Sequence, residues 1–190
     1  MNNNNHMNNN NRVCPVEKAK HLDSFFRKIL QNPQKILRKY INKGMTVLDF
    51  GCGPGFFTIE IAKLLGDNGK VFAVDLQDGM LQILKNKIED SILASRIHIH
   101  KCKEDSIDFT EKVDFILAFY VIHEVPNQAK LFKEFKSILN PNGAILIVEP
   151  KRHVSKTNFE MMINTLKDLE FNILDRPKVF QSRAIYLTSN

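Results

Sequence analysis

The chain alternates short apolar runs with stretches in which apolar residues recur every three or four positions. Runs of the first kind are typical of buried strands, and stretches of the second kind are typical of amphipathic helices. Strands are predicted at residues 46–50, 71–75, 97–100, 114–119 and 144–149, and helices at residues 57–65, 80–88, 131–139 and 158–169. This alternation predicts an α/β fold with right-handed crossovers and a mostly parallel sheet covered on both faces.

Both ends of the chain depart from this alternation. Residues 171–174 and 184–188 are both predicted as strands, and the Pro-containing loop between them is too short for a parallel crossover, so this pair should be antiparallel. Residues 16–40 carry two helical stripes with a break at Asn32-Pro33, which predicts two short helices before the sheet. Residues 1–11 hold eight asparagines and are predicted to be a disordered tail.

Composition narrows the protein class. A chain of 190 residues is long enough for one domain, and it contains neither a long apolar span nor a secretory signal, so we expect a soluble, cytoplasmic protein. The net charge of +6 is scattered among 21 acidic residues, so a nucleic-acid partner is possible but not favoured. Cys14, Cys52 and Cys102 form no CxxC pair, and His6 has no second ligand at useful spacing. We therefore expect reduced thiols and no metal site.

The most informative segment is an apolar strand that ends in Asp49 and Phe50 and continues into Gly51, Gly53 and Gly55. Glycines at alternating positions allow a tight turn and close approach of a ligand. A dinucleotide-binding loop would have G-x-G-x-x-G spacing, whereas Phe56 stands where its last glycine should be. A carboxylate at Asp49 would repel a phosphate and attract an amino acid's ammonium group, partly through water.

A second acidic residue, Asp75, closes the next strand about 20 residues after the last glycine, where a carboxylate can accept hydrogen bonds from ribose hydroxyls. NAD-binding folds also place a carboxylate at this position. Asp75 therefore distinguishes a dinucleotide from an amino-acid-bearing ligand only together with Asp49 and the glycine spacing. The alternatives are a plain turn at the glycines, a helix cap at Asp49 and a loop residue at Asp75.

The segment from Asp49 to Gly55 resembles motif I of the class I S-adenosylmethionine-dependent methyltransferases, and the chain is similar to small members of the ubiquinone/menaquinone-biosynthesis type. The resemblance implies a Rossmann-like three-layer αβα sandwich whose seven-stranded sheet is mostly parallel with an antiparallel last strand. It implies a methyltransferase domain over residues 44–190 and a lid of N-terminal helices over residues 12–43, which include Phe26 and Arg27. It also implies S-adenosyl-L-methionine as cofactor, bound by Asp49, Gly51, Cys52, Gly53, Gly55, Asp75, Leu76, Cys102, Lys103 and Phe119.

The adenine-contacting position departs from the family pattern. The family usually has an acidic residue after the third strand, whereas this sequence places Cys102 there, with the backbone N–H of Lys103 beside it. Glu104 and Asp105 come one or two residues late, so a bulge would be needed to deliver either of them. Leu76 is expected from the family to pack on the adenine.

The segment after the fourth strand is similar to the part of the family that lines the methyl-transfer pocket. His123 is the candidate catalytic residue, because an imidazole can accept a proton near neutral pH. The alternative is a histidine that closes the loop by hydrogen bonding to the backbone. Glu124 is interpreted as a helix-start charge, and Glu149 either touches the substrate or is a strand-end charge at the surface.

The acceptor is narrowed by two absences in the sequence. No Asn/Asp-Pro-Pro-aromatic motif and no nucleophilic cysteine follow residues 114–119, which disfavours methylation of nucleic-acid bases. The first hypothesis is therefore a methyltransferase acting on a small molecule. An RNA or protein methyltransferase, a non-catalytic cofactor-binding partner subunit and an NAD-dependent dehydrogenase remain as alternatives.

Overall fold

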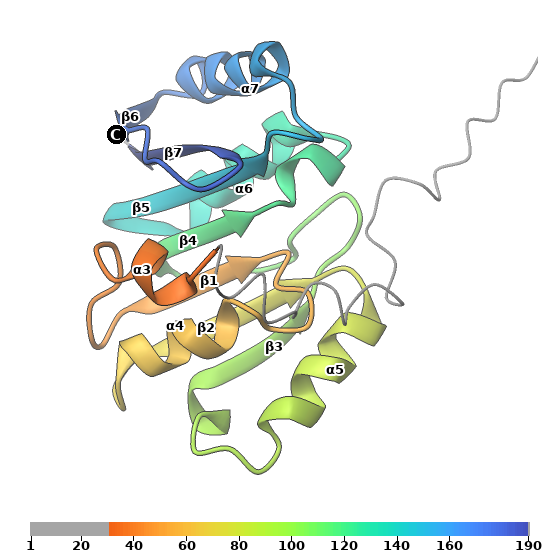
Figure 1. Ribbon diagram of the computed structural model, residues 1–190, viewed down its shortest axis with the longest axis vertical. Helices are drawn as coiled ribbons and strands as arrows, with labels where there is room; N and C mark the ends of the chain where they lie inside the picture. Colours follow the sequence, from red (N-terminus) through yellow and green to blue (C-terminus); the bar gives the residue numbers. More distant parts are fainter. Residues whose placement is uncertain (1–30, 190) are drawn as a thin grey trace, which may run out of the picture.

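The computed structural model describes residues 31–189 (Figure 1). The predictions for the Asn-rich tail, for the first N-terminal helix with Phe26 and Arg27, and for His6 and Cys14 lie outside the described residues.

A seven-stranded sheet forms the centre of the described chain, with the order β3-β2-β1-β4-β5-β7-β6. Strands β1 to β5 pair in parallel, and β7 pairs antiparallel to both β5 and β6, so the predicted mostly parallel sheet with a reversed last strand is confirmed. The strands are β1 (Thr46–Phe50), β2 (Lys70–Asp75), β3 (Ile97–Lys101), β4 (Val113–Phe119), β5 (Leu139–Pro150), β6 (Phe171–Asp175) and β7 (Ser182–Ser189).

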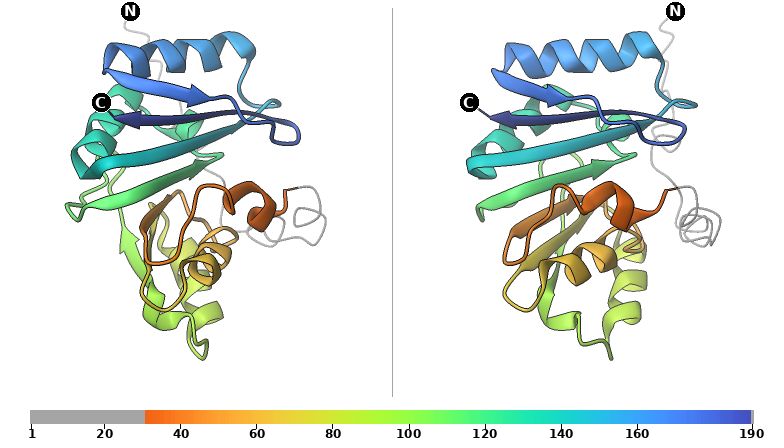
Figure 2. Two further views of the ribbon diagram at one scale, coloured as in Figure 1. Left: turned by 90° about the vertical axis from the view of Figure 1, so that its left-hand side faces the viewer. Right: turned by 60° about the vertical axis from the view of Figure 1, so that its left-hand side comes forward.

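Helices cover both faces of this sheet (Figure 2), which confirms the three-layer αβα sandwich. One buried cluster joins Leu37, Ile61 and Leu84 to the sheet, and another joins Phe132 and Phe159 to the opposite face. Nearly all strand positions in β1, β2 and β4 are buried, as expected for parallel strands covered on both sides. The described helices are α3 (Pro33–Leu37), α4 (Thr58–Leu65), α5 (Asp78–Ile88), α6 (Gln128–Ile138) and α7 (Lys156–Asp168), with 3-10 turns η3 (Ala94–Arg96) and η4 (Ile122–Glu124).

Most helices begin earlier than the apolar periodicity predicts, because their first residues are polar. The side chain of Asn127 accepts a hydrogen bond from the backbone N–H of Lys130 and caps α6, and Ser155 caps α7 in the same way through Asn158. The break predicted at Asn32-Pro33 is the start of α3, since the Asn32 side chain caps that helix. Periodicity marks the buried face of a helix, whereas the cap determines where it starts.

The predicted strand at residues 144–149 is the regular part of a longer strand. β5 begins at Leu139, pairs there with Val113, and resumes pairing at Ala144 opposite Phe115. The four residues between them, 140–143, form an irregularity in which Asn142 has a φ of 66°. No helix among residues 31–189 is long and apolar enough to cross a membrane.

Candidate functional site

The glycine loop connects the end of β1 to α4, and all three of its glycines have positive φ: 70° at Gly51, 53° at Gly53 and 87° at Gly55. A Cβ on Gly51 would lie 2.4 Å from Cγ2 of Val121, which follows β4. A Cβ on Gly55 would lie 2.4 Å from a methyl carbon of Leu84 on α5. These glycines therefore serve both the turn and the close approach of neighbouring elements.

Asp49 lies at the floor of a cleft that opens above the glycine loop. Its side chain is nearly fully buried, and its Oδ2 accepts a hydrogen bond of 2.6 Å from the hydroxyl of Thr58, the first residue of α4. The carboxylate therefore bridges the strand before the loop and the helix after it. It does so through the side-chain hydroxyl of Thr58.

Asp75 connects the loop to the next strand. Its Oδ2 accepts a hydrogen bond of 2.8 Å from the backbone N–H of Gly53, and its Oδ1 accepts one of 2.9 Å from the backbone N–H of Gln77. Burial raises the pKa of this carboxyl group, and the backbone N–H donors of Gln77, Gly53 and Leu76 offset part of that rise. A carboxylate has about four acceptor positions, so one remains beside these three donors, and Asp75 can hold the loop and still bind a ligand hydroxyl.

Cys52 and Cys102 are buried free thiols in the wall of the same cleft. Burial, together with the nearby carboxylates, raises the pKa of Cys52 well above its usual value and that of Cys102 to about 11. Because the reactive form of cysteine is the thiolate, neither side chain is suited to nucleophilic catalysis. The backbone N–H of Lys103 donates to the carbonyl of Ser106 at 2.9 Å, so it is already engaged within its own loop.

A second wall of the cleft is formed by residues at and after the end of β4. Tyr120 has a φ of 65°, which is uncommon for a residue with a Cβ, and its hydroxyl hydrogen-bonds to Oγ of Ser182 at 2.6 Å and also to the side chain of Gln31. Sequence reasoning did not single out Tyr120, because neither its backbone conformation nor its partner on β7 is visible in the local pattern. Glu124 also lines this wall.

Glu149, at the end of β5, is not a surface charge. Its side chain is 1% exposed. Its Oε1 accepts a hydrogen bond of 3.0 Å from the backbone N–H of Ile122, and its Oε2 accepts from the backbone N–H of His123 at 3.3 Å and from the His123 ring at 2.6 Å. Glu149 therefore anchors η4 to the sheet.

His123 sits beside the cleft, and its imidazole is 23% exposed. Since a carboxylate can only accept, the Nδ1 of His123 donates to Glu149, which leaves Nε2 as the ring atom that can exchange a proton with a ligand. Burial alone lowers the pKa of His123, but the hydrogen bond and charge of Glu149, with a contribution from Glu124, outweigh it and raise the pKa overall. The ring contacts Glu149 instead of closing the loop through the backbone.

Most residues that the sequence indicated as a site do meet in one cleft, whereas Gly55 and His123 do not line it. Glu104 is an additional member, and Asp105 is not, because Asp105 pairs with Lys130 instead. The sequence-derived members that line the cleft are Asp49, Gly51, Cys52, Gly53, Asp75, Leu76, Cys102, Lys103 and Phe119.

The chemistry of the cleft fits a cationic amino-acid and ribose ligand. Two buried carboxylates flank the glycine loop, and Lys103 is the single cationic residue among the described lining residues. A phosphate would be repelled by this arrangement, whereas an ammonium or sulfonium group would be attracted. The glycine loop, the two carboxylates and the sheet order together define a class I S-adenosylmethionine-dependent methyltransferase, with S-adenosyl-L-methionine as its cofactor.

Comparison with known families agrees with this class. The profile of the methyltransferase domain family matches residues 41–184, and the chain belongs to that family. A SAM-dependent methyltransferase from Aquifex aeolicus has a similar solved structure, with a TM-score of 0.82 and 27% identity over 92% of this chain and 98% of that one.

Two curated relatives are ubiquinone/menaquinone biosynthesis C-methyltransferases. The chain is 28% identical over 143 residues to the ubiquinone/menaquinone biosynthesis C-methyltransferase UbiE of Idiomarina loihiensis, which covers 74% of this chain and 54% of that protein. It is 25% identical over 134 residues to UbiE of Vibrio vulnificus, a match that covers 70% of this chain and 50% of that protein. The chain thus spans about half the length of the curated relatives it matches.

Proposed function

We propose that this protein transfers the methyl group of S-adenosylmethionine to a small-molecule acceptor, with a carbon atom as the favoured site of methylation. The observation that carries the proposal is the pair of buried carboxylates, Asp49 and Asp75, on either side of the glycine loop. The names of the curated relatives, which are C-methyltransferases, favour carbon over oxygen or nitrogen.

In this proposal the cofactor is held by residues of the cleft. Asp49 attracts the ammonium group of the methionine end, and Asp75 accepts hydrogen bonds from the ribose. Gly51, Gly53 and Cys52 provide the backbone surface, whereas Gly55 keeps the loop packed on α5. Leu76, Cys102 and Phe119 complete the apolar walls, and Lys103 lies beside Cys102. When bound, S-adenosylmethionine supplies an already activated methyl group, so no covalent enzyme intermediate is required.

His123 is the proposed proton acceptor. Its Nε2 would take a proton from an acidic hydroxyl or carbon of the acceptor, and Glu149 would stabilise the imidazolium that results. Glu149 fixes both the ring and the backbone of η4, so it is a positioning residue in this scheme. The N-terminal segment, residues 12–43, is proposed to cover the cleft as a lid over the domain at residues 44–190.

The cofactor part of the proposal is tested by titration calorimetry with S-adenosylmethionine and S-adenosylhomocysteine. We expect micromolar binding to the wild type, at least tenfold weaker binding to Asp75→Ala, and unchanged binding to Asp78→Asn, a control that removes an exposed carboxylate nearby. NADH should not bind. Binding of NADH without S-adenosylhomocysteine would replace the proposal with a dehydrogenase.

The transfer part is tested by release of S-adenosylhomocysteine with a panel of phenolic, enolic and amine acceptors. Product mass and fragmentation then locate the methyl group. We expect His123→Ala to lower kcat by about a hundredfold while the Kd for S-adenosylhomocysteine changes less than twofold. Cofactor binding without turnover of any acceptor, together with a stable protein partner in pull-downs, would instead indicate a non-catalytic subunit.

A further inference from the structure

A second cleft lies at the same edge of the sheet as the cofactor cleft. It is formed by residues after β5, the start of α7 and the loop from β6 to β7. Because β6 runs parallel to β5, its carboxyl end and the beginning of β7 lie beside the carboxyl end of β5. Parallel α/β sheets bind their ligands along this edge.

The second cleft is strongly cationic. Its charged lining residues are Lys151, Lys156, Arg176, Lys178, Arg183 and one acid, Glu160. Glu160 is already committed to Arg176, through contacts of 2.6 and 3.1 Å between the guanidinium and the carboxylate. Among the described residues, no carboxylate lies within 4.0 Å of the three lysine nitrogens, and Glu160 is the one lining carboxylate whose charge also acts on Lys156. Gathering like charges without counter-charges is unfavourable unless an anion balances them.

Arg183 makes the strongest case for a missing anion. Its Nη1 is buried and has no hydrogen-bond partner among the described residues. The residue opposite on the neighbouring strand is Glu149, but the carboxylate of Glu149 is used by the backbone and ring of η4. A buried guanidinium nitrogen without a partner is costly, and carboxylates and phosphates are the groups that pair best with a guanidinium.

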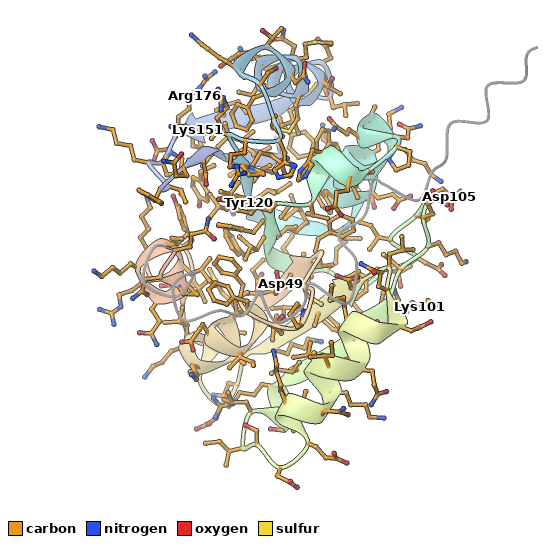
Figure 3. The ribbon with its side chains drawn as sticks, turned by 45° about the vertical axis from the view of Figure 1, so that its right-hand side comes forward. Asp49, Lys101, Asp105, Tyr120, Lys151 and Arg176 are labelled. Atoms are coloured by element: carbon orange, nitrogen blue, oxygen red, sulfur yellow. The ribbon has the colours of Figure 1, made fainter. Side chains whose placement is uncertain are left out.

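The two clefts share a wall. Tyr120 lines the cofactor cleft and Ser182 lines the cationic cleft, and their hydroxyl groups are 2.6 Å apart. The labelled residues Asp49, Tyr120, Lys151 and Arg176 follow one another along the edge of the sheet (Figure 3), as the strand order requires. The hydrogen bond between the Tyr120 and Ser182 hydroxyl groups places the cationic cleft directly beside the cofactor cleft.

We propose that the cationic cleft binds an anionic group, a phosphate or a carboxylate, of the methyl acceptor. This inference rests on the proposed function, and it assigns the acceptor to the class of small organic acids or phosphate esters. A small anion is favoured over a nucleic-acid backbone because the five cationic residues line a single cleft, formed by the segment after β5, the start of α7 and the loop from β6 to β7.

The test measures binding of inorganic pyrophosphate and citrate by calorimetry at low ionic strength. Lys151→Gln/Lys178→Gln removes two exposed charges from the cleft, and Lys85→Gln/Lys133→Gln removes two exposed charges elsewhere. We expect the first pair to weaken binding of at least one probe about tenfold. The control pair should change it less than twofold. Arg183→Gln should weaken it further, and circular dichroism checks its folding. The stronger probe distinguishes a phosphate from a carboxylate.

Several results would overturn this inference. One is that neither pyrophosphate nor citrate binds, and another is that the two lysine pairs weaken probe binding equally. A third is that a single-stranded 20-nucleotide RNA binds more tightly than either probe and that the cleft variants weaken this RNA binding. S-adenosylhomocysteine is titrated in parallel on the same samples. If the wild type does not bind S-adenosylhomocysteine, the result counts against the proposed function alone. If the wild type binds it but the cleft variants leave binding of the anionic probes unchanged, the result counts against the anionic acceptor alone.

Discussion

Replacement of Glu149 by glutamine tests how η4 is held over the sheet. The carboxylate accepts three hydrogen bonds: from the N–H of Ile122, from the N–H of His123 and from the His123 ring. Glutamine has nearly the same shape, but its amide carries a single oxygen and no charge. Whichever way the amide is turned, its NH₂ group faces an N–H donor of η4.

The expected loss of folding stability in Glu149→Gln follows from the number and kind of hydrogen bonds that the substitution weakens. Hydrogen bonds to an ionised group contribute roughly 2 kcal/mol each and neutral ones about 1 kcal/mol, so three weakened bonds cost about 3 kcal/mol. For a domain of this size we expect the melting temperature to fall by about 6 to 12 °C. His123→Ala removes the ring contact with Glu149 but leaves both backbone N–H donors in place, so it should destabilise the protein by about 2 kcal/mol.

The assay is urea unfolding followed by far-UV circular dichroism, because the chain contains no tryptophan to serve as a fluorescence signal. Glu89→Gln, which removes an exposed carboxylate at the end of α5, is the matched control and should lie within about 0.5 kcal/mol of the wild type. A free energy of unfolding for Glu149→Gln equal to that of this control would refute the anchoring role of Glu149.

Two further predictions concern the same region. Gly51→Ala should destabilise the protein by about 3 kcal/mol, because the φ of Gly51 is positive and the new methyl group would overlap Val121. Gly44 also has a positive φ but has open space around it, so Gly44→Ala should cost about 1 kcal/mol. Thermal unfolding measures both losses. NMR titration should give His123 a pKa above 6.5 in the wild type and a lower one in Glu149→Gln. The stability that the ion pair of His123 and Glu149 contributes is then present in full below pH 6.5 and is lost as the pH rises through the raised pKa of His123. An equal pKa of His123 in the wild type and in Glu149→Gln would contradict this prediction.

The local pattern of the sequence was enough to determine the fold class. Each strand of a covered parallel sheet is a short apolar run, and each crossover helix has an apolar stripe, so both are recorded in neighbouring residues. The loop at residues 51–55 and the carboxylates of Asp49 and Asp75 were predictable for the same reason, because a strand end followed by spaced glycines is a local signal. Helix starts were missed by a few residues, since polar caps carry no periodicity.

Only the tertiary structure decided which distant residues meet. Glu149 reaches η4 because β5 lies beside β4, although the two segments are more than twenty residues apart. Tyr120 meets Ser182 because the reversed strand β7 is inserted next to β5. The cationic cleft combines residues near 151 with residues near 183 for the same reason. Hydrophobic periodicity specifies which side of an element is buried, but the order and direction of strands specify its neighbours, and side-chain partners follow from those neighbours.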